Sequence, residues 1–260
     1  MSASALVGFT GFVGSNLAAQ HPFESTYNSR NIGDIAGRTF ELLVFAGAGS
    51  KKWWANEHPI EDWVSIQKAI DPLAAVRAHQ AVLISTIDVI PATESAKGEL
   101  ANCDIGETSA YGRNRRRLEE LFVRQFASSL VVRLPALFGR GLKKNVIYDL
   151  MHDHMLEKIN PASSFQYYDV ARLWSDVTVA LKAGVDLVHL FPEPIATHTI
   201  VKNFFSCKVI GRDASPVAHY DYRTRHGDLF GGTNAYVEQS GTVLTRLRAF
   251  ISAELNGEIR

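Results

Sequence analysis

The chain has 260 residues, of which 46% are hydrophobic and 21% charged, as is ordinary for a globular protein. Its 27 basic and 27 acidic side chains cancel, so no overall field attracts nucleic acid or an anionic membrane surface. The two cysteines, Cys103 and Cys207, lack the spacing of metal ligands or of a disulfide framework. Neither a signal peptide nor a run of roughly 18 apolar residues is found. The composition therefore predicts a soluble, cytoplasmic protein that binds no metal, no nucleic acid and no membrane.

Short apolar runs alternate with helical patterns along the first half of the chain. The runs that predict buried strands cover residues 5–7, 42–46, 81–85 and 130–134, and another strand is expected within residues 25–31. The helical patterns cover residues 14–20, 60–79 and 109–126. Strands that are apolar on both faces and separated by helices form a parallel sheet that is covered on both sides. The pattern predicts an α/β fold with a doubly wound parallel sheet, which binds its ligands at the carboxyl ends of the strands.

A glycine-rich turn, GFTGFVG at residues 8–14, joins the first strand to the first helix. Glycines at this spacing permit a tight turn and let the backbone approach a pyrophosphate, whose charge suits the N-terminus of a helix. The alternative is a tight turn that binds no ligand. Its place between a strand and a helix favours dinucleotide binding. The residues expected to hold the dinucleotide are Gly8, Thr10, Gly11, Phe12, Val13 and Gly14.

The choice of dinucleotide depends on the strand expected within residues 25–31. No acidic residue closes this strand, so the carboxylate that would bind a ribose 2′-hydroxyl is missing. Arg30 stands there instead, and its cation suits the 2′-phosphate of NADP; the alternative is a solvated loop arginine. The sequence thus predicts NADP or NAD as the cofactor and favours NADP.

After Pro135 the alternation of strands and helices weakens. Residues 1–135 are predicted to form a dinucleotide-binding Rossmann core, and residues 136–260 a smaller C-terminal substrate-binding lobe. A helix expected at residues 169–182 rejoins the core, which then includes about residues 165–185. The stretch between the second strand and Leu42 is short for a full strand–helix–strand unit, which indicates that one sheet element is lost.

The helical segment AYGRNRRRLEEL, residues 110–121, begins with a tyrosine that is followed by four arginines. Tyr111 and Arg115 share one face of a helix, whereas Arg116 and Arg117 rotate toward solvent. A nearby positive charge favours the phenolate, and lowering a tyrosine pKa from about 10 to about 7 takes roughly 4 kcal/mol. This stabilisation of the phenolate is expected to come from Arg115, a nicotinium charge and partial burial together. A tyrosine tuned in this way can exchange a proton with a substrate hydroxyl or carbonyl; the alternative is a solvated helix that happens to begin with tyrosine.

Several motifs in order resemble one family. They are GFTGFVG at residues 8–14, STIDV at 85–89, Tyr111 at 25 positions after Thr86, RLPALFG at 133–139, GLKKN at 141–145 and YDV at 168–170. At these residues the chain resembles the extended short-chain dehydrogenase/reductase superfamily, in its NAD-dependent epimerase/dehydratase group of nucleotide-sugar enzymes. The resemblance covers about residues 5–200.

The resemblance implies a role for each matching residue. Tyr111 would be the general acid/base, Thr86 would hydrogen-bond the substrate oxygen, and the nicotinamide would give or take a hydride. Arg115 stands where the family has a lysine and would hold the cofactor in its place. The segment beside the cofactor would be Ala46, Gly47 and Ala48, and the substrate contacts would come from Thr86, Asp88, Lys144 and Asn145.

Two departures from the family pattern leave two hypotheses. Arginine for lysine at position 115 is not a conservative change, and Ser65 stands near the place of a helix asparagine. The first hypothesis is an NAD(P)-dependent oxidoreductase or epimerase that acts on a carbonyl or hydroxyl of a nucleotide sugar, as a homodimer. Ketone reduction is favoured over dehydration, because Asp88 is the one acidic residue near Thr86. The second is a non-catalytic NAD(P)-binding sensor or assembly protein of the same fold.

Overall fold

The structure is a computed structural model that describes residues 3–91, 98–103, 108–212 and 214–257. The chain divides into two compact units. The first unit comprises Met1–Leu134 and Trp174–His189, and the second comprises Pro135–Leu173 and Leu190–Arg260. Each unit contains a hydrophobic core made of its own residues.

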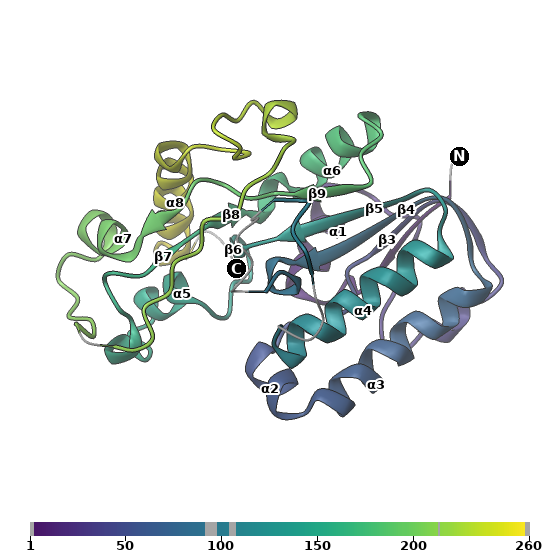
Figure 1. Cartoon of the computed structure of the whole chain (residues 1–260), viewed down its shortest axis with the longest axis horizontal. Helices are drawn as coiled ribbons and strands as arrows, with labels where there is room; N and C mark the ends of the chain where they lie inside the picture. The colour runs from purple at the N-terminus through teal and green to yellow at the C-terminus, as the bar shows by residue number, and fades with distance from the viewer. Residues whose placement is uncertain (1–2, 92–97, 104–107, 213, 258–260) are drawn as a thin grey trace. The chain divides into compact units, whose positions relative to one another are not determined.

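The first unit is built on a six-stranded sheet in the order β2-β1-β3-β4-β5-β9, with all neighbouring strands parallel (Figure 1). The strands are β1 (Ser4–Val7), β2 (Ser25–Tyr27), β3 (Thr39–Phe45), β4 (Arg77–Thr86), β5 (Ser129–Leu134) and β9 (Leu187–His189). The prediction of an α/β fold with a doubly wound parallel sheet is confirmed. Between β2 and β3 the chain forms only the 3-10 turn η1 (Ile32–Ile35), which agrees with the shortness of that stretch.

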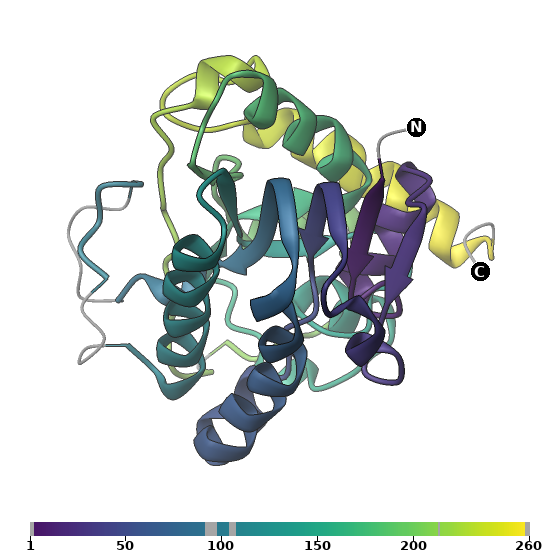
Figure 2. The same cartoon turned by 90° about the vertical axis from the view of Figure 1, so that its right-hand side faces the viewer.

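Helices cover both sides of this sheet. They are α1 (Phe12–Gln20), α2 (Lys52–Glu57), α3 (Pro59–Ile70), α4 (Ala110–Gln125) and α6 (Leu173–Lys182). Both views show α3 and α4 on one side of the sheet and α6 on the other (Figures 1 and 2). Ile66 of α3 and Phe122 of α4 join one core with the strand residues Leu43 and Leu83, because alternate residues of a strand face the same side.

A buried ionic network joins three strands to α4 at the carboxyl edge of the sheet. Arg133 of β5 binds both carboxylate oxygens of Glu119, at 3.0 and 2.7 Å, and Ser85 of β4 donates to the same carboxylate at 2.6 Å. His189 of β9 lies 3.3 Å from the third guanidinium nitrogen of Arg133. Burial opposes ionisation of Glu119, but Arg133, with Ser85 and Arg116, outweighs it and holds the pKa of this carboxyl below its usual value.

Within its described residues, the second unit contains two short pairs of strands and three helices. The strand β6 (Ala136–Phe138) pairs in parallel with β8 (Tyr167–Asp169), and β7 (Ser164–Phe165) pairs antiparallel with β10 (Ile195–Ala196). The helices are α5 (Val146–Met151), α7 (Thr197–Phe204) and α8 (Ser240–Leu255). Apolar residues of α8, Val243 and Leu247, belong to the core that also contains Phe138 and Tyr167.

Two helices differ from their predicted bounds, and 3-10 turns account for the difference. The helix predicted at residues 60–79 ends at Ile70, because Pro72 has no N–H to continue it; η2 (Asp71–Ala75) follows, and β4 begins at Arg77. The helix predicted at 169–182 begins at Leu173, after η6 (Val170–Arg172). The short elements α2 and β9 were not predicted. Elsewhere in the described residues, 3-10 turns are found at η3 (Ile87–Val89), η5 (Leu156–Lys158) and η7 (Gly227–Phe230).

Replacing Glu119 by glutamine tests the buried network. Glu119→Gln leaves the Arg133 guanidinium buried without its counter-charge, so we expect the free energy of unfolding to fall by about 3–5 kcal/mol in urea denaturation at pH 7. The contribution of the ionised Glu119 is present above its unfolded-state pKa of about 4.3 and is lost as the pH falls through its lower folded-state pKa. The variant should therefore lose less stability than the parent protein below about pH 4.

The control is Glu120→Gln on the same helix, since Glu120 forms a half-exposed pair with Arg116 at 3.4 Å. A change of less than about 1 kcal/mol is expected there. Equal losses in the two variants would contradict a special role for the buried pair.

Candidate functional site

The candidate groups of the first unit converge on the carboxyl ends of three neighbouring strands. The glycine turn follows β1, residues 46–48 follow β3, and Thr86 ends β4. Because β1, β3 and β4 are adjacent and parallel, these segments come to one edge of the sheet. Tyr111 reaches this edge from the start of α4, where Ser109 caps the helix by accepting a hydrogen bond from the Gly112 N–H at 3.2 Å.

Tyr111 is held by contacts on several sides. Its ring is buried, with 8% exposed, and its backbone N–H donates to Asn56 Oδ1 of α2 at 2.9 Å. The Thr86 hydroxyl acts on the phenol and favours its ionised form. The next residue, Gly112, lets α4 lie directly on η3, since a Cβ atom there would come within 2.1 Å of the Asp88 carbonyl oxygen. The structure therefore brings Tyr111 and Thr86 together through the close packing of α4 on η3.

Arg115 lies one helical turn beyond Tyr111 and points back across its ring. The guanidinium carbon is 4.0 Å from the ring centroid, a cation–π arrangement. One nitrogen of the group pairs with Asp62 of α3 and another donates to the carbonyl oxygen of Gly49, in the segment after β3. Since only 3% of Arg115 is exposed, its charge is committed to these contacts.

The pKa of Tyr111 moves in the direction opposite to the one that the sequence suggested. Burial of the ring raises it above the ordinary value, Asp88 adds to this, and the charges of Arg115 and Lys52 with the Thr86 hydrogen bond offset it only in part. The expectation that Arg115 would bring the phenol near neutrality is thus not met by the protein groups alone. The phenol of the protein by itself is protonated at neutral pH.

A second ion pair lies beside this tyrosine. Lys52, the first residue of α2, pairs with Asp88 of η3, and Thr86 donates to the other carboxylate oxygen of Asp88 at 3.3 Å. Thr86 also accepts a hydrogen bond from the Asp88 N–H at 3.2 Å, which caps η3. Asp88 is thereby oriented by both Thr86 and Lys52.

The glycine turn forms a cradle that admits only glycine at two positions. Gly8 has φ +89°, and a Cβ atom there would come within 2.4 Å of the Ala46 carbonyl oxygen. At Gly14 a Cβ atom would come within 2.0 Å of the Gly8 carbonyl oxygen. Gly11, the N-cap of α1, has no side chain with which to cap the helix, so the first backbone N–H groups remain able to bind an anion. These features fit a dinucleotide pyrophosphate.

The end of β2 carries polar side chains and no carboxylate. Asn28 follows the strand directly, and its backbone N–H donates to Asn31 Oδ1 at 2.7 Å. Arg30 is exposed in this turn, and its N–H donates to Asn28 Oδ1 at 2.9 Å. An exposed guanidinium next to the adenosine side of a Rossmann site can accept a 2′-phosphate, so the residues present fit NADP as well as NAD.

The remaining substrate candidates, Lys144 and Asn145, belong to the second unit. Asn145 caps α5: its Oδ1 accepts from the N–H groups of Ile147 and Tyr148 at 2.9 and 3.2 Å, and its amide donates to Leu137 O at 2.8 Å. Its polar atoms thus have structural partners. Lys144 is exposed.

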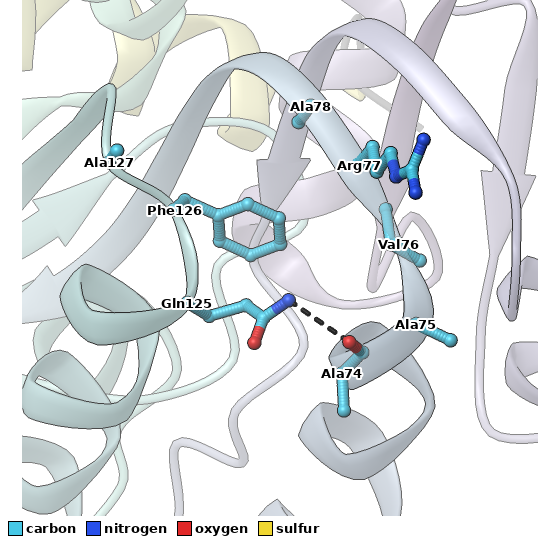
Figure 3. Close-up of a pocket in the computed structure, with 8 residues that line it drawn as sticks. All are labelled: Ala74, Ala75, Val76, Arg77, Ala78, Gln125, Phe126 and Ala127. Atoms are coloured by element: carbon cyan, nitrogen blue, oxygen red, sulfur yellow. Dashed lines mark hydrogen bonds between the residues drawn. The ribbon is translucent and has the colours of Figure 1, made fainter.

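A hollow of about 460 Å³ lies away from these groups, at the amino end of β4 (Figure 3). Its lining runs over residues 74–78 and 125–127. The Gln125 amide donates to the Ala74 carbonyl at 3.2 Å, and Arg77 supplies the one charged side chain of the lining. Arg77 and Thr86 stand at opposite ends of a ten-residue strand, about 30 Å apart. This hollow carries no pair of groups suited to catalysis and is not the candidate site.

Sequence reasoning missed four residues of the site. Lys52, Asn56, Asp62 and Gly49 all contact Tyr111, Arg115 or Asp88. The first three lie on α2 and α3, and Gly49 lies in the segment that leads to them. Their place in the sequence could have pointed to them, because this stretch directly follows a predicted strand and therefore begins at the ligand-binding edge of the sheet.

Within the described residues, no group of three or more histidine, cysteine or acidic side chains is placed to hold a metal ion. Over the same part of the chain, none of the helices combines the length and hydropathy needed to span a bilayer.

The solved structures that resemble this chain share its fold at low sequence identity. A dTDP-4-dehydrorhamnose reductase from Bacillus anthracis in complex with NADP has a TM-score of 0.70 and 13% identity over 91% of this chain and 94% of its own. A UDP-galactose 4-epimerase has a TM-score of 0.68 and 16% identity over 90% and 92%. An NAD-dependent NDP-hexosamine 5,6-dehydratase of tunicamycin biosynthesis has a TM-score of 0.66 and 13% identity over 87% and 89%. No protein-family profile and no curated protein sequence matches the chain.

These similarities define the class of the fold. The chain shares its fold with solved structures of nucleotide-sugar reductases, epimerases and dehydratases.

The glycine cradle can be tested with a pair of alanine substitutions. Gly14→Ala should weaken the binding of NADPH and NADH at least about tenfold, because the added methyl group displaces the Gly8 carbonyl and opens the turn. Isothermal titration calorimetry measures the dissociation constants. Gly33→Ala is the control, since a Cβ atom at Gly33 would meet nothing within 4 Å. Unchanged dinucleotide binding by Gly14→Ala would contradict the assignment of this turn to the cofactor.

Proposed function

We propose that the chain is an NAD(P)-dependent oxidoreductase that reduces a carbonyl group of a nucleotide sugar, with NADPH favoured over NADH. The observation that carries the proposal is that Tyr111 and Thr86 lie at the same carboxyl edge of the sheet, where α4 packs directly on η3. Two hydroxyl groups at such a place can bind one substrate oxygen and exchange a proton with it. The structures of nucleotide-sugar enzymes that share the fold support the substrate class.

Several elements of the first unit would hold the cofactor. The backbone of Gly11, Phe12 and Val13 would bind the pyrophosphate at the N-terminus of α1, and Thr10 lies in the same turn. Arg30 would bind the 2′-phosphate, and the segment Ala46, Gly47 and Ala48 would lie along the dinucleotide. When bound, the nicotinamide supplies or accepts the hydride, for which the protein has no group of its own.

The chain's own residues would manage the proton and the substrate oxygen. Thr86 would donate a hydrogen bond to the carbonyl oxygen, which becomes more negative as the carbonyl carbon receives a hydride. Tyr111 would then give its phenolic proton to that oxygen, which leaves an alcohol and a phenolate. Because burial keeps the phenol protonated, the resting site is prepared to donate a proton rather than to take one. This favours reduction over the reverse oxidation.

The raised pKa of Tyr111 gives the reaction a predictable pH dependence. In the direction of reduction, kcat/KM should stay level from about pH 6 to about pH 9 and fall only above about pH 10, because the phenol must carry its proton. A pH profile with saturating NADPH measures this. A decline centred near pH 7 would show instead that the active phenol is tuned downward, as the sequence had suggested.

Removal of the two hydroxyl groups tests the site directly. Oxidation of NADPH is followed at 340 nm with 4-keto sugar nucleotides, in the parent protein, Tyr111→Phe and Thr86→Val. We expect kcat to fall by about 10²- to 10⁴-fold in Tyr111→Phe, because the proton donor is lost. Thr86→Val should lower kcat by about 10²-fold, because one hydrogen bond to the developing charge is lost. Turnover that survives in Tyr111→Phe would assign catalysis to another group.

A second function is favoured by the state of Arg115. The guanidinium is buried and bound by Asp62 and Gly49, so its charge is already paired within the protein. A protein with this arrangement that binds NAD(P) without turnover would act as a sensor or an assembly partner. Tight binding of NADPH in calorimetry, with no oxidation on any carbonyl substrate, would favour this alternative.

The homodimer remains a proposal, and exposed apolar side chains support it. Trp53 of α2 and Ile60 of α3 are 63% and 74% exposed, and Val64 lies one turn beyond Ile60 on the same face. A second copy of the chain would cover this face.

A further inference from the structure

The cation that stacks on the Tyr111 ring, Arg115, cannot exchange protons with its surroundings. A guanidinium stays protonated at any ordinary pH, and this one is buried and held by Asp62 and by the Gly49 carbonyl. Asn114 strengthens this arrangement by donating to Asp62 at 2.8 Å. Arg115 therefore acts as a fixed charge over the tyrosine ring and as a structural tie between α4, α3 and the segment after β3.

Lys52 occupies a different kind of place. It begins α2, and its ammonium group pairs with Asp88, whose second oxygen accepts a hydrogen bond from Thr86. The same η3 turn packs against the start of α4, where Gly112 lies directly on the Asp88 carbonyl. Lys52 and Thr86 both act on the Tyr111 phenol and favour its ionised form. The side chain of Lys52 is 44% exposed and that of Asp88 19%, so this end of the chain of contacts meets solvent.

We propose that Lys52 is a positioning residue of the Tyr111 site: its ammonium, held by Asp88, supplies the exchangeable positive charge beside the phenol that Arg115 cannot supply. The inference rests on the proposed function, in which Tyr111 gives a proton to the substrate. After that step the positive charge of Lys52 favours the phenolate, and solvent can return the proton at this open end.

Three charged groups act on the phenol among the described residues, each from a different element. Arg115 of α4 and Lys52 of α2 favour the phenolate, and Asp88 of η3 opposes it. Burial outweighs the two cations and leaves the pKa of Tyr111 raised. Loss of Lys52 removes one of the two favourable charges and also leaves Asp88 without its counter-ion, so both effects act in the same direction.

The test is a titration of Tyr111 that does not depend on turnover. The protein carries tyrosine labelled with ¹³C at Cζ, and Tyr111→Phe identifies the Tyr111 signal by its loss. Lys52→Met should move the titration of Tyr111 to higher pH, and Lys52→Arg, which keeps the charge, should restore it toward that of the parent. Asp88→Asn should move it to lower pH. Lys51→Met, which removes the neighbouring exposed lysine, is the matched control and should leave the titration unchanged.

Steady-state kinetics supply the second readout. Lys52→Met should lower kcat about tenfold with the KM values for NADPH and substrate nearly unchanged, and Lys52→Arg should recover only part of it, because arginine returns the charge without exchanging its proton. A raised KM with unchanged kcat would overturn the inference and assign Lys52 to substrate binding.

A Tyr111 titration that is the same in Lys52→Met and Lys51→Met would also overturn it. The two proposals fail separately. If the parent protein shows no turnover but the titration of Tyr111 shifts in Lys52→Met, only the catalytic function is overturned. If turnover is lost in Tyr111→Phe but neither kcat nor the titration of Tyr111 changes in Lys52→Met, only the role of the lysine is overturned.

Discussion

A guanidinium that is taken out of water must be neutralised, and the partners of Arg115 determine how the site is built. Asp62 neutralises it from α3 and the Gly49 carbonyl binds it from the segment after β3. The stack of the guanidinium on the Tyr111 ring adds a third contact. Because an uncompensated buried charge costs several kcal/mol, these three elements cannot separate without a large penalty. The position of the phenol at the sheet edge follows from this constraint.

Arginine stands at position 115, where the family that the sequence resembles has a lysine, so under our proposal the role of that one lysine would be divided between two side chains. The charge that fixes the tyrosine is buried, permanent and part of the core. The charge that can respond to solvent is proposed to come from Lys52, on another helix and with a carboxylate partner of its own. Such a division keeps the electrostatic character of the site while it changes the chemical properties of the cation.

Much of the fold could be predicted because its strands are apolar on both faces, which only a covered parallel sheet explains. The end of α3 was predicted wrongly because the apolar rhythm continues past Pro72, and the loss of one N–H decided the boundary. The edge strand β9 is three residues long, too short to give a pattern. At the site, Tyr111 and Thr86 were found because their motifs are local. Lys52 and Asp62 were not, because ion pairs between residues 36 and 53 positions apart leave no spacing rule in the sequence.

Both outer strands of the sheet, β2 and β9, are only three residues long, whereas β3, β4 and β5 between them have seven, ten and six. An outer strand exposes unpaired backbone groups that can recruit a strand of another molecule. Here β2 and β9 each offer so few unpaired backbone groups that an added strand would form few hydrogen bonds. The long central strands are already paired on both sides. Contacts between copies of the first unit would then fall to its helical surfaces rather than to the edges of its sheet.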